Sequence, residues 1–90
     1  MITAKQIIVK GKVQGVNFRY HTRRQAQKLG LFGTVENLPD GRVMLRAEGK
    51  LADVDNLVEW CRKGPDSARV EGIEVSDCLV RGYKEFSIHR

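Results

Sequence analysis

The residues best suited to chemistry lie in one stretch near the N-terminus, Gly11-Lys12-Val13-Gln14-Gly15-Val16-Asn17-Phe18-Arg19. An alternating apolar segment ends there and a polar amphipathic segment begins, which predicts a strand that runs through a glycine loop into a helix. The first N–H groups of a helix lack intrahelical partners, and the helix dipole favours negative charge at that end. Gly15 lets a ligand approach the backbone, and Arg19 supplies a planar guanidinium suited to phosphate oxygens. The stretch therefore predicts a phosphate-binding loop with its own arginine.

The glycine spacing by itself does not identify a nucleotide site. No Gly-Lys-Ser/Thr follows the loop, so it is not a Walker motif. Gly11 and Gly15 are also spaced wrongly for the dinucleotide pattern G-x-G-x-x-G, and no third glycine completes it. Most strand–glycine loop–helix junctions bind nothing, so the phosphate hypothesis needs support from elsewhere in the chain.

Length and composition indicate one small globular domain. The chain has 90 residues, 41% of them hydrophobic, and a formal net charge of +5. That charge would suit nucleic acid, an anionic surface or a small anionic substrate, and does not choose among them. No apolar run approaches the roughly 18 residues that would span a bilayer, and residues 1–5 lack the apolar core of a secretory signal. We therefore expect a cytoplasmic protein.

The cysteines and histidines do not predict a metal site. Cys61 and Cys78 have no CxxC spacing, and only His21 and His89 could add nitrogen ligands. Cys61 falls on an apolar helical stripe and is expected to be a buried reduced thiol. The sequence does not decide whether Cys61 and Cys78 form a disulfide. His21 is expected on the surface of its helix, and no function is assigned to His89.

Hydrophobic periodicity and turn residues divide the chain into seven elements. Strands are predicted over residues 5–13, 32–37, 42–49, 70–77 and about 84–90, and helices over 18–29 and 51–63. Their order predicts an α+β fold of the ferredoxin-like split βαβ type (βαββαβ), in which two helices cover one face of an antiparallel sheet. Residues 1–90 are expected to form a single domain. Right-handed crossovers would place the first strand centrally, beside the third, and so bring the end of the second strand, at Asn37, near the glycine loop.

The sequence also resembles a known family. The stretch from Gly11 to Arg19 is similar to the G-x-V-Q-G-V-x-F-R signature of the acylphosphatases. Three further segments resemble the family: Gly33-Thr34-Val35-Glu36-Asn37 with the following Gly41, Gly64-Pro65-Asp66-Ser67-Ala68-Arg69-Val70, and Phe86-Ser87-Ile88. Together they cover nearly the whole chain. Thr34 departs from the pattern, which often has an aromatic residue there, and this should affect packing rather than chemistry.

The resemblance implies hydrolysis of the carboxyl–phosphate bond of a small acyl phosphate, without metal or cofactor. Arg19 would be the catalytic phosphate-binding arginine, and Asn37 would position the attacking water. Backbone N–H groups of Gln14, Gly15, Val16, Asn17 and Phe18 would hold the phosphate oxygens together with Arg19. Inorganic phosphate would act as product or inhibitor. A monomer with no nucleic-acid or membrane partner is expected.

Several alternatives stay open on the residues alone. Asn37 precedes Leu38-Pro39-Asp40-Gly41 and could be only a turn residue, while Phe18 suits the core better than a ligand. Arg23 and Arg24 are either solvated or enrich anionic substrate near the site. The fold also permits RNA binding, but the predicted central strands lack the aromatic residues that stack bases. A module of a larger carbamoyl-transfer enzyme is a third interpretation, which the complete two-layer plan disfavours.

Overall fold

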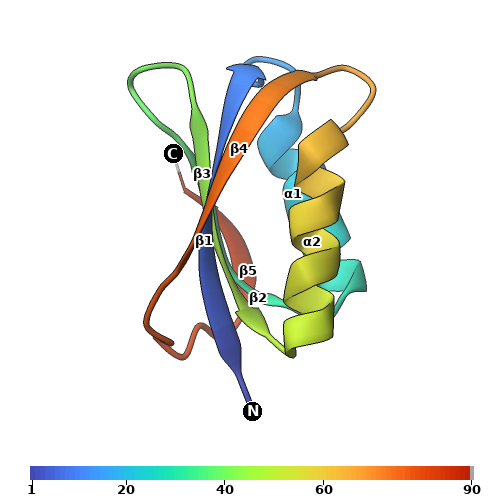
Figure 1. The fold of residues 1–90 in the computed structure, drawn as a ribbon. Helices are drawn as coiled ribbons and strands as arrows, with labels where there is room; N and C mark the ends of the chain where they lie inside the picture. Colours follow the sequence, from blue (N-terminus) through green and yellow to red (C-terminus); the bar gives the residue numbers. More distant parts are fainter. Residues whose placement is uncertain (90) are drawn as a thin grey trace.

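Two helices cover one face of a five-stranded sheet (Figure 1) in the computed structural model, which describes residues 1–89. The elements are β1 (Thr3–Lys12), α1 (Phe18–Lys28), β2 (Phe32–Asn37), β3 (Val43–Gly49), α2 (Leu51–Lys63), β4 (Arg69–Asp77) and β5 (Phe86–His89). All seven predicted elements are present, with ends that differ by no more than two residues; Arg90, where the last strand was predicted to end, lies outside the described residues. The predicted ferredoxin-like α+β fold is confirmed. No helix among these residues is long and apolar enough to cross a membrane.

The strand order is β4-β1-β3-β2-β5, so β1 lies centrally and pairs with β3, as expected. The pairs β1–β4, β1–β3 and β2–β3 are antiparallel, but β2 and β5 run parallel. The expectation of a wholly antiparallel sheet is therefore corrected to a mixed one. The reason is topological. Three antiparallel pairings make β4 antiparallel to β2, so β4 finishes at the end of the sheet where β2 starts, and the connection that crosses to β5 enters it in the direction of β2.

The core lies between the helices and the inner face of the sheet. Ile7 and Val9 of β1 stand opposite Leu45 and Val43 of β3, and all four are fully buried. The helices contribute the buried side chains Phe18, Thr22 and Ala26 from α1, and Val54, Leu57, Val58 and Cys61 from α2. These are the positions that the helical period predicts, and each large apolar side chain stabilises the fold by roughly 1.5–3 kcal/mol.

Close packing at the start of α1 depends on a glycine. Gly64 ends α2 with a φ of 70°, and a Cβ atom there would lie 2.9 Å from the ring of Phe18. Phe18 itself packs against Trp60, with ring centroids 5.7 Å apart. Phe18 is therefore a core residue that fixes where α1 begins, and the helix N-terminus is held against α2.

The connection from β4 to β5 is held by one buried carboxylate. Glu48 on β3 accepts hydrogen bonds from the backbone N–H groups of Arg81, Gly82 and Tyr83. A buried carboxylate requires such donors, because its desolvation is costly without them. This contact sets the path into β5, whose far end reaches the candidate site described below.

The β1–β4 register shifts between Lys10, which pairs with Gly72, and Gly11, which pairs with Val70, so Glu71 forms a bulge in β4. The cysteines are both free: Cys61 is buried and Cys78 is partly exposed. The expected reduced thiol at Cys61 is confirmed, and the disulfide that the sequence left open is not formed.

Candidate active site

The site is built around the junction of β1 and α1, which residues 13–17 form; we call this segment the glycine loop. Gly15 has a φ of 74°, and Asn17, the N-cap of α1, has φ 61° and ψ 26°. Glycine and asparagine are the residues that adopt this left-handed conformation most readily. Successive N–H groups in such a loop form a concave site for anions. The first helical bond runs from His21 N to Asn17 O, so the N–H groups of residues 18–20 have no partner within the helix.

Side chains from two other parts of the chain hold the glycine loop. Gln14 Nε2 donates to the carbonyls of Leu38 and Arg42, at 2.8 and 2.9 Å. Ser67 Oγ, from the connection between α2 and β4, donates to the carbonyl of Val16 at 2.8 Å. The loop is therefore tied to the β2–β3 turn on one side and to the α2–β4 connection on the other. Its N–H groups can remain directed at a ligand without reorganisation.

The register of the sheet places Asn37 beside this loop. Asn37 pairs with Val43, and Val43 pairs with Val9, so the three residues lie in a row across β2, β3 and β1. Directly opposite residues share one face of a sheet. Since Val9 and Val43 are buried beneath the helices, Asn37 also lies on the helix-covered face, at the end of the sheet where β1 passes into the glycine loop.

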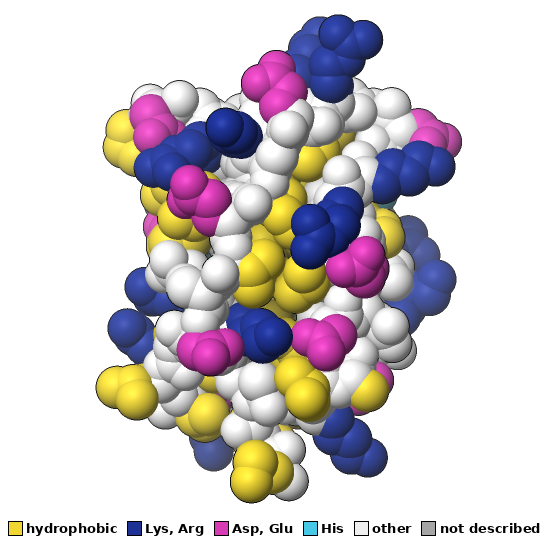
Figure 2. Space-filling model, viewed as in Figure 1, with side chains coloured by type: hydrophobic (Ala, Val, Ile, Leu, Met, Phe, Trp, Pro, Cys, Tyr) yellow, Lys and Arg dark blue, Asp and Glu magenta, His cyan; other side chains and the backbone are white. Residues whose placement is uncertain are grey.

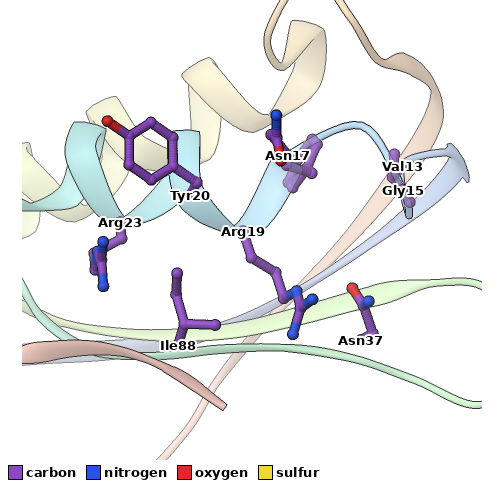
Figure 3. A pocket seen from close by; sticks show the side chains of 9 residues that line it. Val13, Gly15, Asn17, Arg19, Tyr20, Arg23, Asn37 and Ile88 are labelled. Atoms are coloured by element: carbon purple, nitrogen blue, oxygen red, sulfur yellow. The ribbon is translucent and has the colours of Figure 1, made fainter. Parts of the chain in front are cut away.

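Arg19 reaches the same space from the helix. Figure 3 shows its side chain extending from α1 toward the sheet, with the carboxamide of Asn37 rising beside the guanidinium. Arg19 Nη1 donates to the carbonyl of His89 on β5, at 3.1 Å. The Asn17 side chain points away from both groups in this view, so the contribution of Asn17 to the site is its backbone.

These groups surround a depression of about 480 Å³. Its lining residues are Val13, Gly15, Asn17, Phe18, Arg19, Tyr20, Arg23, Asn37 and Ile88. Five of the seven residues predicted for the site, Gly15, Asn17, Phe18, Arg19 and Asn37, therefore meet in one place. The other two, Gln14 and Val16, are not among the lining residues and contribute contacts that shape the loop.

The lining is electropositive. Its charged side chains are Arg19 and Arg23, and no Asp or Glu of residues 1–89 lines the depression. Together with the helix N-terminus, the two arginines favour an anion. Within the same described part of the chain, no group of three or more His, Cys, Asp or Glu side chains gathers as a metal site would require. His21 lies outside this depression, against a second one between the helices that Trp60 also lines.

Three contributions to the site were missed by sequence reasoning. The sequence predicts a role only for the backbone N–H of Gln14, whereas its side chain links the glycine loop to the β2–β3 turn. The sequence marks Ser67 only as a polar residue within the segment from Gly64 to Val70, and its contact with the carbonyl of Val16 is not predictable from that. The His89 contact uses a backbone carbonyl, for which no side-chain pattern exists.

The fold and the site define a class of protein: a ferredoxin-like α+β domain whose first strand–helix junction is arranged for an anion. The family model for acylphosphatases matches residues 5–88. The protein named acylphosphatase from Acaryochloris marina is 46% identical, over 99% of this chain and 96% of its own length. The crystal structure of the acylphosphatase from Bacillus subtilis has 38% identity and a TM-score of 0.94, with each chain covered completely. The chain belongs to the acylphosphatase family of hydrolases.

The same domain also occurs within a longer protein. The structure of full-length HypF in its phosphate- and nucleotide-bound form includes a region that matches all of this chain, with 30% identity and a TM-score of 0.90. That region is only 12% of the HypF chain. The domain thus forms nearly the whole of some relatives and a small part of another.

Proposed function

We propose that this protein hydrolyses the carboxyl–phosphate bond of small acyl phosphates, giving a carboxylate and inorganic phosphate, without a metal ion. The observation that carries the proposal is the meeting of Arg19 from α1 and Asn37 from β2 in one depression, beside the N-terminus of a helix. The named acylphosphatases to which the chain is similar support the same substrate class.

In this proposal the phosphate end is held by the backbone and one guanidinium. The N–H groups of the glycine loop and the first turn of α1, with Arg19, bind the phosphate oxygens and neutralise the charge that develops on them. A carboxylate is a good leaving group, so no strong general acid is needed at the acyl end. Catalysis then rests on positioning and electrostatic stabilisation, which a site lined by two arginines is able to supply.

Asn37 orients the attacking water. Its carboxamide offers both a donor and an acceptor, so it can fix a water in line with the scissile bond. An amide is a poor base, and the proton of the water therefore passes to a phosphate oxygen or leaves with the product. Inorganic phosphate, as the product, would compete for the same N–H groups and for Arg19.

RNA binding is not supported by the same observations. On the helix-free face, β1 and β3 present Gln6, Ile8, Met44 and Arg46, and these include no aromatic ring for a base to stack on. Figure 2 shows Lys and Arg side chains interspersed with Asp and Glu on the face it views, rather than a continuous basic surface.

The test is phosphate release from benzoyl phosphate in the presence of EDTA. The wild-type protein should hydrolyse benzoyl phosphate. Asn37→Ala should lower kcat by about 10²–10³, the usual cost of removing one oriented hydrogen-bond donor to the transition state, with little change in inhibition by phosphate. Arg19→Ala should lose both turnover and phosphate inhibition. Arg19→Lys should fail as well, because an ammonium cannot reproduce the bidentate fork.

Two residues outside the depression give matched controls. Arg24→Ala removes an arginine from the same helix, and Asn56→Ala removes an asparagine from α2. Both should retain wild-type kinetics. A fully active Arg19→Ala protein, or activity that EDTA abolishes and an added divalent metal restores, would refute the proposal.

A further inference from the structure

The carboxamide of Gln14 joins the two halves of the proposed site. Its Nε2 group donates to Leu38 O at 2.8 Å and to Arg42 O at 2.9 Å, and the side chain is partly buried. Leu38 and Arg42 stand on opposite sides of the β2–β3 turn. They also pair with each other, since Leu38 N donates to Arg42 O at 2.8 Å. One side chain from the glycine loop thus closes the base of the turn.

Glutamine is the side chain that this position requires. Two carbonyl oxygens face it, so the group must provide two donors from one nitrogen, as a primary carboxamide does. A glutamate of the same shape would bring a charged acceptor against two acceptors. A methionine would fill the same volume but leave both carbonyls without this partner, at a cost of about 0.5–1.5 kcal/mol for each hydrogen bond.

The hydrogen bond between Gln14 and Leu38 joins two residues that each neighbour a residue of the proposed site. Leu38 directly follows Asn37, and Gln14 directly precedes Gly15, where the backbone takes its left-handed conformation. The turn beyond Leu38 is otherwise held by local contacts, among them Gly41 N to Leu38 O at 3.2 Å and Arg42 N to Asp40 Oδ1 at 3.1 Å. These fix the shape of the turn but not its distance from the glycine loop. The β1–β3 pairing brings the turn to the same end of the sheet as the loop, and Gln14 adds a direct side-chain link between the two.

We propose that Gln14 is a positioning residue, whose side chain sets the carboxamide of Asn37 relative to the anion held by the glycine loop. This inference rests on the proposed function for its kinetic consequence, since Asn37 is the residue that it positions. Gln14 does not line the depression, and so its side chain would act without touching the substrate.

The kinetic test uses Gln14→Met and Gln14→Glu with benzoyl phosphate. Each should lower kcat about tenfold, the effect of roughly 1.4 kcal/mol, and should change competitive inhibition by inorganic phosphate less than about twofold because Arg19 and the N–H groups remain. Gln6→Met is the matched control: Gln6 also makes a side-chain hydrogen bond, from Arg46 Nη2 at 3.3 Å, but on the helix-free face. It should be silent. Loss of phosphate inhibition equal to the loss of kcat would overturn the proposal.

A double-mutant cycle separates positioning from general damage to the fold. If Gln14 acts through Asn37, then Gln14→Met should cost less than about twofold when Asn37 is already alanine. In an Arg23→Met background, which alters the lining of the depression but keeps Arg19 and Asn37, it should still cost the full factor. Multiplicative losses with Asn37→Ala would show that Gln14 acts elsewhere and would overturn the inference.

Hydrogen exchange gives a readout that does not depend on activity. The N–H of Leu38 is bonded across the turn to Arg42, and its exchange in Gln14→Met should be about tenfold faster than in wild type. The N–H of Leu45, in the middle of β3, should keep its wild-type protection. Unchanged exchange at Leu38 would overturn the link itself, even in a protein that hydrolyses acyl phosphates. Faster exchange in a protein without that activity would uphold the link and reject the proposed function instead.

Discussion

Arg19 donates a hydrogen bond from Nη1 to the backbone carbonyl of His89, at 3.1 Å, across 70 residues of sequence. The guanidinium is therefore oriented by the last residue of β5. That strand in turn is placed by its parallel pairing with β2, in which Glu36 stands opposite His89. The arginine proposed to bind phosphate and the strand that carries Asn37 thus share one support at this edge of the sheet.

Removing residues 89 and 90 should weaken phosphate binding. The deletion takes away the acceptor that orients Arg19, and a hydrogen bond to a charged group is worth about 1.5–3 kcal/mol before allowance for its exposure. We expect a roughly three- to tenfold rise in the inhibition constant of phosphate. His89→Ala is the matched control, since it keeps the carbonyl, and it should leave that constant unchanged. Equal effects of the deletion and His89→Ala would assign the role to the imidazole.

Arg23 should assist substrates whose acyl group is itself anionic. It lines the depression one helical turn beyond Arg19, which is roughly 6 Å along α1. The neighbouring Arg24 also lies over the Tyr20 ring. The distance from the guanidinium carbon to the ring centroid is 5.8 Å for Arg24 and 5.9 Å for Arg23, but Arg24 does not line the depression. Arg23→Met should raise KM several-fold more for 4-carboxybenzoyl phosphate than for benzoyl phosphate. Arg24→Met should change KM for the two substrates by the same factor. If Arg23→Met and Arg24→Met had the same effect on the two KM values, only the overall positive charge of the surface would be responsible.

Much of the site follows from local sequence rules. The change of hydrophobic period at residues 13–18 predicts the strand–loop–helix junction, and the right-handed crossover predicts that β1 is central. The approach of Asn37 to the loop can be deduced from these two features, because the β2–β3 hairpin is short. The face on which Asn37 lies then depends on the register with Val43 and Val9.

The remainder depends on contacts that have no local signal. The direction of β5 is decided by where the connection from β4 enters the sheet, and Glu48 holds that connection from a different strand. Gln14 bonds the backbone carbonyl of Leu38, which is 24 residues away in sequence, and Ser67 bonds the backbone carbonyl of Val16, which is 51 residues away. A carbonyl is present at every position, so the sequence does not mark the one that accepts.

Cys61 should make the protein less stable in alkali. Burial disfavours the thiolate and raises its pKa from 9.0 to about 12. The unfolded chain therefore releases the thiol proton near pH 9, while the folded protein keeps it. The contribution of the protonated Cys61 to stability is complete below pH 9 and is lost as the pH rises toward 12. The free energy of unfolding should fall by up to about 1.4 kcal/mol per pH unit from this group.

Urea unfolding of wild type and Cys61→Ala between about pH 8 and pH 11 measures that slope. Cys61→Ala should be less stable at the lower pH, because it leaves a small cavity, but should decline less steeply above the ordinary pKa of a thiol. Val58→Ala, which also removes core volume from α2 but no titrating group, should keep the wild-type slope. Parallel slopes for wild type and Cys61→Ala would contradict the assignment.

Ser67 should support phosphate binding without touching phosphate. Its hydroxyl donates to the carbonyl of Val16 at 2.8 Å, and Ser67 is exposed, so Ser67→Ala should leave the core intact. Losing one such bond costs about 0.5–1.5 kcal/mol, which corresponds to a roughly two- to tenfold weaker inhibition by phosphate if the loop becomes mobile. Ser67→Thr keeps the hydroxyl and should restore binding. Because the glycine loop is proposed to hold the anion and Asn37 lies on β2, kcat should fall less than phosphate binding, the reverse of the pattern expected for Gln14→Met. A fall in kcat with unchanged phosphate inhibition would mean that the Ser67 contact supports Asn37 rather than the loop.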